Sequence, residues 1–137
     1  MSFSTMFADV NFLAVLVATV LAFVIGGLWY SPMLFFKAWL DGAGLTEEQS
    51  QQGHPAKIYG GAFVMTFIAA TLLAVVIGDH KSLASGLHWG LIVGLGWVST
   101  SFATNYLFER RSFKLWLVNA GYNVVLFTVM GVVIGLW

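Results

Sequence analysis

The sequence of 137 residues contains no cysteine and few charged residues. Without cysteine the chain forms no disulfide and carries no thiolate nucleophile, cysteine-ligated iron–sulfur cluster or c-type haem attachment. Charged residues make up 9%, well under the roughly 25% of soluble domains. The formal net charge is zero, so we expect no nucleic-acid partner. The N-terminus also lacks the basic region and cleavage site of a signal peptide, so we expect the first apolar run to be retained.

Hydrophobic residues are abundant, at 59% of the chain, and they gather in four runs free of Asp, Glu, Lys and Arg. A helix needs about 20 apolar residues to cross the hydrocarbon core of a bilayer, and each run is long enough. The runs are too long and too uniformly apolar for the alternating strands of a barrel. We therefore predict an all-α, four-helix transmembrane bundle in a single domain, residues 1–137. Its spans are expected at about 9–31, 58–78, 84–107 and 114–136.

The first run ends in a stretch with the features of a membrane boundary, GGLWYSPMLFFKAWL at residues 26–40. Trp29 and Trp39 belong to the amphipathic aromatics that favour the membrane–water interface, and Lys37 must reach water. Ser31-Pro32 between them is a helix-start signal, because Ser caps a helix and Pro fits its first position. The stretch predicts a short interfacial helix after the first span.

Three stretches carry a resemblance to a known family: WYSPMLFFKAW, NYLFERRSFKLWLVNAGYNVV and the closing MGVVIGLW. They resemble a family of small bacterial integral membrane proteins called domain of unknown function 1761. The resemblance covers nearly the whole chain and implies a membrane bundle. It brings no established activity with it.

The basic residues predict the orientation of the chain. The connections after the first and third spans hold five of the six, and the second connection holds only Lys81. Basic residues accumulate on the cytoplasmic side, so we expect loop 32–57 there and both termini outside. The protein is predicted to be a multi-pass protein of the cell membrane, the bacterial inner membrane. Within the loop, Thr46 to Gln49 matches a capping box, and we favour a solvated linker over a gate or lid.

Small residues recur every four positions at Gly86, Gly90 and Gly94, and again at Ala14, Ala18, Ala22 and Gly26. Such stripes let helices approach closely in membranes, where no hydrophobic force drives association. The pattern indicates helix packing, and it leaves open whether the partner helix belongs to the same chain. Because the glycine stripe is long, we expect a homo-oligomer in the lipid bilayer.

Polar side chains converge near the predicted cytoplasmic ends of the first, third and fourth spans. Asn119 and Asn123 share one helix face, as do Asn105 and Glu109. The candidate ligand-binding residues are Trp29, Tyr30, Ser31, Asn105, Glu109, Arg110, Arg111, Asn119, Tyr122 and Asn123. Interhelical hydrogen bonding is the favoured interpretation, and a ligand or ion pocket is the alternative. In a pocket, the arginines would suit a small anionic or lipid-like ligand; otherwise they set topology and contact headgroups.

No catalytic or metal-binding motif stands out. Asp9, Asp79, His80 and His88 are ligand types for divalent metals, but their spacing matches no metal motif, so we expect no metal and no cofactor. We find no Ser-His-Asp order, paired intramembrane carboxylates or phosphate loop. The favoured function is an oligomeric transporter, channel or ligand-binding protein. The alternatives are a structural or accessory protein that stabilises a partner complex and a membrane enzyme acting on lipophilic substrates.

Overall fold

The computed structural model describes residues 2–137, and within that range the regular structure is entirely helical. Four helical segments are long and apolar enough to cross a membrane. They are α1 (Phe12–Trp29), α4 (Pro55–Ile77), the continuous segment α5 (Leu83–Leu91), η1 (Ile92–Val98) and α6 (Ser99–Glu109), and α7 (Phe113–Leu136). Two short helices, α2 (Phe36–Ala43) and α3 (Glu47–Ser50), lie between the first two spans. The predicted all-α fold with four membrane-length helices is confirmed, and the length and apolar composition of these helices indicate a membrane protein.

Polar side chains fix where most helices begin. An oxygen or nitrogen of the N-cap side chain accepts a hydrogen bond from a backbone N–H of the first turn, which would otherwise be unpaired. The caps are Asn11, Thr46, His54, Ser82 and Ser112, for α1, α3, α4, α5 and α7. The Thr46 cap includes the capping box with Gln49. The Asn11 cap explains why α1 begins at Phe12, a few residues after the expected start of the first span.

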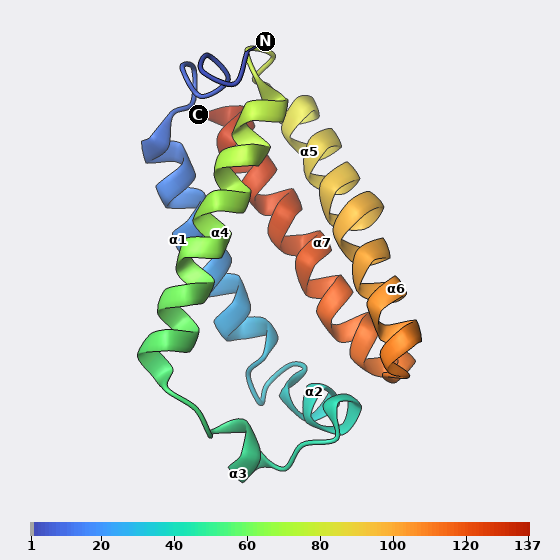
Figure 1. Ribbon diagram of the computed structural model, residues 1–137. Helices are drawn as coiled ribbons and strands as arrows, with labels where there is room; N and C mark the ends of the chain where they lie inside the picture. Colours follow the sequence, from blue (N-terminus) through green and yellow to red (C-terminus); the bar gives the residue numbers. More distant parts are fainter. Residues whose placement is uncertain (1) are drawn as a thin grey trace.

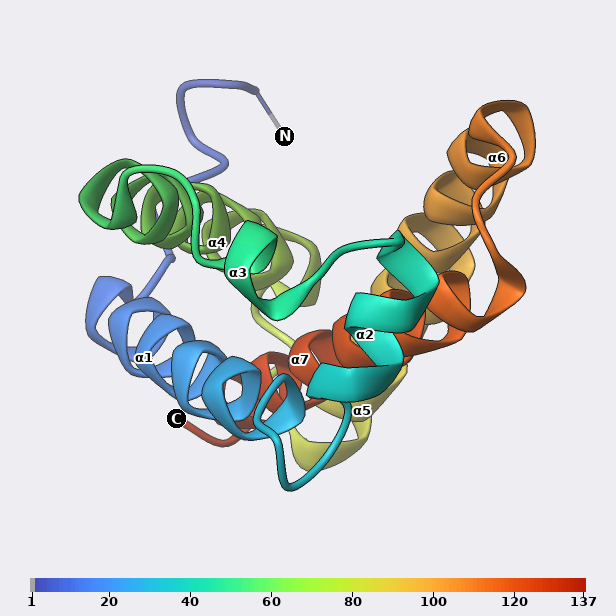
Figure 2. The same ribbon diagram turned by 90° about the horizontal axis from the view of Figure 1, so that it is seen from below.

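The central element is α7, which contacts all the other spanning helices. Seen along the bundle, α1 and α4 lie on one side of α7 and α6 projects on the other (Figure 2). Both termini and the turn between α4 and α5 lie at one end of the molecule (Figure 1). The opposite end holds α2, α3 and the turn between α6 and α7. We call this the α2–α3 end.

The hydrophobic core occupies the half of the bundle near the termini. Its buried residues come from the first part of α1 and the last parts of α4 and α7: Val15, Ala18, Ala22, Ala70, Leu73, Ala74, Ile77, Leu126, Phe127, Met130 and Ile134. Towards the α2–α3 end, α4 buries no residue before Ala70. The first half of α4 therefore stands away from its neighbours, and this leaves room for a cavity between α1 and α4.

The glycine stripe of the third span packs against α7 of the same chain. Gly86 lies against the backbone of Gly131, and a Cβ at Gly90 would come within 2.6 Å of the Phe127 carbonyl oxygen. Only glycine permits this approach, because any side chain would meet backbone. The stripe that led us to expect an oligomer is therefore occupied within one chain, and an oligomer would need another surface.

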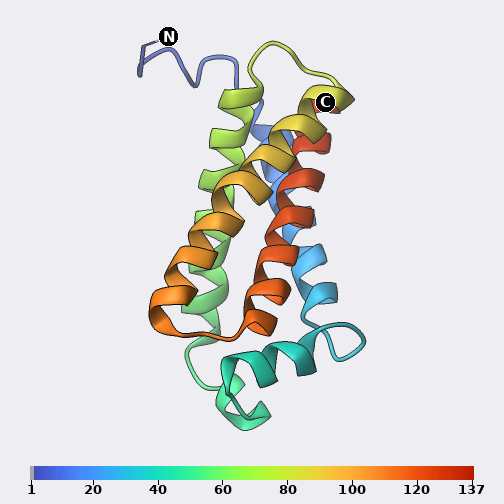
Figure 3. The ribbon, with the colours of Figure 1, turned by 90° about the vertical axis from the view of Figure 1, so that its right-hand side faces the viewer.

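A π-helix, η1, interrupts the third span at the end of this close contact and includes Gly94, the last glycine of the stripe. It begins at Ile92, and the Ser99 hydroxyl donates to the Gly94 carbonyl oxygen, five residues back, at 2.7 Å. Beyond η1 the axis of α6 diverges from α7 towards the α2–α3 end (Figure 3). Long side chains bridge the widening gap: the Trp116 indole N–H donates to the Ser99 carbonyl oxygen at 2.9 Å.

Candidate functional site

A chain of hydrogen bonds joins three helices near the α2–α3 end. The Tyr30 hydroxyl, at the end of α1, donates to Asn119 Oδ1 on α7 at 2.7 Å. Asn119 Nδ2 in turn donates to the Tyr106 hydroxyl on α6 at 2.9 Å. The structure thus brings together Tyr30 and Asn119 from the predicted set and adds Tyr106, which the sequence analysis did not name.

Two more predicted residues also connect α1 with α7. The Trp29 indole N–H donates to the Val118 carbonyl oxygen at 2.9 Å, and the Tyr122 hydroxyl donates to the Ala22 carbonyl oxygen at 3.3 Å. The rings of Tyr30 and Tyr122 meet edge to face, with centroids 5.2 Å apart. These contacts hold the ends of α1 and α7 together and fix the Tyr122 ring beside Tyr30.

The remaining predicted residues do not join this cluster. Ser31 and Asn123 hydrogen-bond within their own segments, to the carbonyl oxygens of Leu28 at 2.7 Å and Asn119 at 2.8 Å. Four others are exposed, at the end of α6 or in the turn that follows it: Asn105, Glu109, Arg110 and Arg111. The arginines therefore lie at the turn between α6 and α7, across the molecule from the end of α1.

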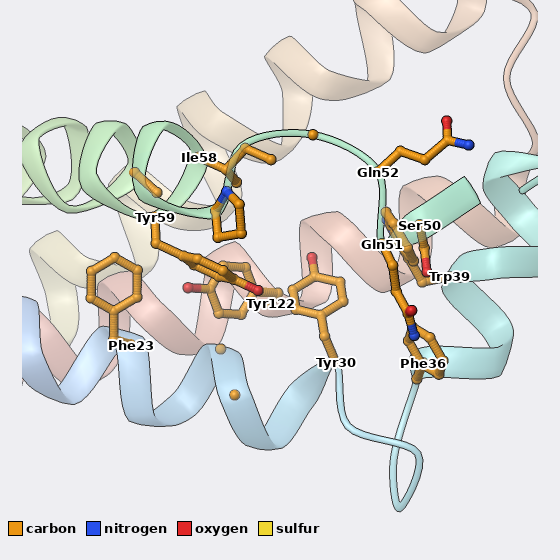
Figure 4. A pocket seen from close by; sticks show the side chains of 15 residues that line it. Phe23, Tyr30, Phe36, Trp39, Ser50, Gln51, Gln52, Ile58, Tyr59 and Tyr122 are labelled. Carbon is orange, nitrogen blue, oxygen red and sulfur yellow. The ribbon is translucent and has the colours of Figure 1, made fainter. Parts of the chain in front are cut away.

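A cavity of about 930 Å³ lies between α1 and α4 at the α2–α3 end. Phe23, Gly26 and Gly27 of α1 and Tyr30, directly after it, line one wall, and residues 58, 59 and 62 of α4 line the other. Tyr122 reaches in from α7, and the sticks of Figure 4 show its ring between those of Tyr30 and Phe23. Of the ten predicted site residues, Tyr30 and Tyr122 line this cavity.

Polar residues from the chain between α2 and α4 border the cavity. Ser50, Gln51 and Gln52 lie at one end of it, beside Phe36 and Trp39 of α2 (Figure 4). The opposite end, around Phe23, is aromatic, and Phe23 stacks on Phe63 of α4 with ring centroids 5.5 Å apart. The cavity therefore has an aromatic end and an amide-bearing end. The linker interpretation of residues 41–57 did not foresee that part of the loop lines a cavity.

Contacts at the start of α7 hold α2 in position beside the cavity. The Ser112 hydroxyl donates to the Gly42 carbonyl oxygen at 3.1 Å, and a Cβ at Gly42 would lie 2.9 Å from the Leu115 nitrogen. Lys114 and Asp41 add an exposed ion pair at 3.4 Å. Exposed pairs contribute little, roughly 0–1 kcal/mol, so close backbone packing is the main restraint on α2. This packing keeps Trp39 of α2 at the cavity wall.

The polar atoms of the described part of the chain are well satisfied. Among residues 2–137 no buried side-chain nitrogen or oxygen lacks a hydrogen-bond partner. Over the same residues, no three His, Asp or Glu side chains gather into a metal-binding group. His88 lies beside Trp89, with ring centroids 6.2 Å apart. The structure thus offers one prominent chemical feature, the cavity with its aromatic and amide-bearing ends.

These features define a four-span helical membrane protein with a cavity at one end of the bundle. Residues 13–135 match the family described as "Protein of unknown function (DUF1761)". The match spans nearly the whole chain, so the protein belongs to this family, as the sequence resemblance indicated. No curated protein and no solved structure matches the chain.

Proposed function

We propose that the protein is a ligand-binding membrane protein that takes up a small lipophilic molecule in the cavity between α1 and α4. The observation that supports this most is the cavity itself. Its volume, about 930 Å³, lies within the roughly 300–1,000 Å³ typical of ligand pockets, which combine apolar and aromatic walls with a few polar groups. The walls here have that character, with Phe, Tyr and Trp rings and a few amide groups.

The proposed setting is the bacterial inner membrane, with the cavity on the cytoplasmic side and both termini outside. Five of the six basic residues, namely Lys37, Lys57, Arg110, Arg111 and Lys114, belong to segments at or adjoining the α2–α3 end. The distribution of Lys and Arg in short loops governs orientation, and the richer side faces the cytoplasm. A ligand would thus be held at the inner boundary of the membrane, within reach of both lipid and cytoplasm.

The hydrogen-bonded chain through Asn119 acts as a scaffold in this proposal. Asn119 Oδ1 accepts a hydrogen bond from the Tyr30 hydroxyl and Asn119 Nδ2 donates one to the Tyr106 hydroxyl, so both polar atoms of the amide are in use. Tyr30 is the member that also lines the cavity. Asn119 therefore positions the Tyr30 ring without contacting the ligand.

A structural or accessory role is the second candidate. The observation that favours it is that four of the ten side chains predicted as a site bond to neighbouring helices, and the ten do not point at a common space. Under that role the cavity is filled by lipid tails without selectivity, or by a partner protein.

Native mass spectrometry from mild detergent or nanodiscs, with lipids retained, separates the two candidates. Gly27 lines the cavity, and a Cβ there meets no atom within 4 Å, so Gly27→Phe should fill the cavity without disturbing packing. Gly60 of α4 is equally open but does not line the cavity, so Gly60→Phe is the matched control. We expect a small molecule bound to the wild type and to Gly60→Phe and absent from Gly27→Phe. Bare protein in all three, or equal binding by all three, would favour the structural role.

A further inference from the structure

Resting on the proposed function, we infer that the cavity selects an uncharged, ring-bearing molecule that carries a hydroxyl or carbonyl group. Its ring lies among Phe23, Tyr30, Tyr59 and Tyr122, and its polar group meets the side-chain amide of Gln51. The sequence analysis associated a ligand with Arg110 and Arg111 and hence with negative charge. The cavity indicates a different chemistry.

Charge is excluded by the lining. The residues that line the cavity are glycine, alanine, isoleucine, proline, serine, glutamine and aromatic residues, and none of them is charged. An ion moved out of water without a partner of opposite charge loses hydration energy that such walls cannot replace. A second, smaller hollow shares Gln51 with the cavity and is lined by Glu47 and Glu48, so acidic side chains stand close to the polar end. They disfavour an anion further.

The spacing of the aromatic rings suits a flat ligand. Phe23 on α1 and Tyr59 on α4 face each other across the cavity, with Tyr122 and Tyr30 following towards the polar end (Figure 4). Tyr30 also meets Trp39 edge to face at 6.3 Å, so rings border the cavity along much of its length. Aromatic pairs in stacked or edge-to-face geometry contribute about 0.5–1.5 kcal/mol beyond simple burial. A ring gains from this arrangement more than a flexible alkyl chain does.

The polar end offers one free amide group, that of Gln51, whereas the Gln52 side chain points away from the rings (Figure 4). The side chain of Gln49 is used in the capping box of α3, and the Ser50 hydroxyl donates to the Glu47 carbonyl oxygen at 2.6 Å. The side chains of Gln51 and Gln52 make no hydrogen bond within residues 2–137. A primary amide both donates and accepts, so it pairs with a hydroxyl or a carbonyl group.

A set of naphthalene probes tests this specificity. The purified protein in nanodiscs of zwitterionic lipid is dialysed at neutral pH against naphthol, naphthoate or naphthylmethylammonium, and partition into empty nanodiscs is subtracted. The three probes share one ring system and differ in charge. We expect naphthol to bind at least about tenfold more tightly than either ion, a ratio that corresponds to about 1.4 kcal/mol. Gln51→Leu should weaken naphthol and leave naphthalene, which has no polar group, unchanged.

The controls separate failure of the inference from failure of the proposed function. Gly27→Phe and Ala62→Phe fill the cavity from opposite walls, so both should abolish the naphthol signal, whereas Gly60→Phe should retain it. If the ions bind as tightly as naphthol and the filling variants abolish all binding, the cavity is a ligand site and the inference about charge is wrong. If no probe exceeds the signal of the two filling variants, the proposed function and the inference both fail.

Discussion

Asn119 is the residue on which the junction of α1, α6 and α7 depends most. It is the middle member of the chain from Tyr30 to Tyr106, and it uses both atoms of its amide there. Interhelical hydrogen bonds in membrane proteins contribute about 0.6 kcal/mol on average and up to about 1.7 kcal/mol. Loss of Asn119 removes two of them at once and leaves two hydroxyl groups without their partner.

Asn119→Ala should therefore lower the thermal stability of the purified protein by about 1–3 kcal/mol. Thermal unfolding in mild detergent, followed by circular dichroism, measures the change. Asn105→Ala is the matched control, because Asn105 is exposed and makes no side-chain hydrogen bond within the described residues. Equal melting temperatures for Asn119→Ala and the wild type would show that the hydrogen bonds from Tyr30 through Asn119 to Tyr106 contribute nothing to stability.

The sequence analysis named Asn105 where the structure uses Tyr106, and the π-helix is the reason. In an unbroken α-helix with 3.6 residues per turn, Asn105 would lie on the same face as Gly94 and would therefore point towards α7. The π-helix takes an extra residue into one turn, so the next residues facing α7 are Ser99 and then Tyr106. No composition signal marks η1 in the sequence. In contrast, Tyr30 and Asn119 were predictable, because each lies at the same depth, close to the end of its span.

At the scale of the helices, the closest packing is that of α5 on α7 through glycine. Gly86 and Gly90 bring the two backbones into direct contact, and the contact continues to Gly94 inside η1. From there α6 diverges, and side chains such as Trp116 take over from glycine. The third span is thus fixed to α7 near the termini and open near the α2–α3 end.

Replacement of Gly90 by alanine should destabilise this contact. The added Cβ would lie 2.6 Å from the Phe127 carbonyl oxygen and 2.7 Å from the Thr128 Cα, and neither backbone atom can move independently. Overpacking of this kind costs about 1–3 kcal/mol. Gly96→Ala is the matched control, since a Cβ there meets no atom within 4 Å. Thermal unfolding of both variants should show a lower melting temperature for Gly90→Ala only; a neutral Gly90→Ala would contradict the observed packing.

The helices themselves were largely predictable, and the cavity was not. Charge-free runs and capping residues mark the spans within a few residues, because lipid requires long apolar helices. The first half of α4 carries no charge after Lys57 and reads as part of the same span, so the sequence does not reveal that only the second half, from Ala70, is buried. Gln51, Gln52 and Tyr59 were missed because they lie outside the predicted polar cluster. Tyr30 and Tyr122 were predicted as site residues, and Trp39 belongs to the interfacial stretch.

For the whole molecule, the even number of spans places both termini at one end, opposite α2 and α3. The positive charges predict that the α2–α3 end is cytoplasmic. Single cysteines can report this cleanly, because the natural sequence has none. In intact cells, Ser4→Cys should react with a membrane-impermeant maleimide and Glu48→Cys should react only after the cells are opened. The reverse pattern would invert the topology, and labelling of both from outside would contradict four spans.

Assembly into a homo-oligomer stays a prediction. The glycine stripe that suggested it lies against α7 within one chain. The sides of α1, α4 and α6 that face away from α7 are available to lipid or to another copy (Figure 2). Leu107 and Phe108 at the end of α6 are 78% and 85% exposed, as lipid-facing residues are. The native mass spectrum that tests ligand binding also counts the chains.

The central claim is that the space between α1 and α4 is an accessible binding cavity, and the reactivity of a cysteine at Ala62 tests it most directly. Ala62 lines the cavity, and Gly61 beside it does not. The reaction rate of Ala62→Cys with an uncharged benzyl methanethiosulfonate is measured in the otherwise natural protein and in the protein that also carries Gly27→Phe. Gly61→Cys, measured in the same two backgrounds, is the control. We predict that Gly27→Phe slows Ala62→Cys by at least about tenfold, through exclusion from a filled site, and leaves Gly61→Cys unchanged. Equal rates for Ala62→Cys with and without Gly27→Phe would contradict the claim.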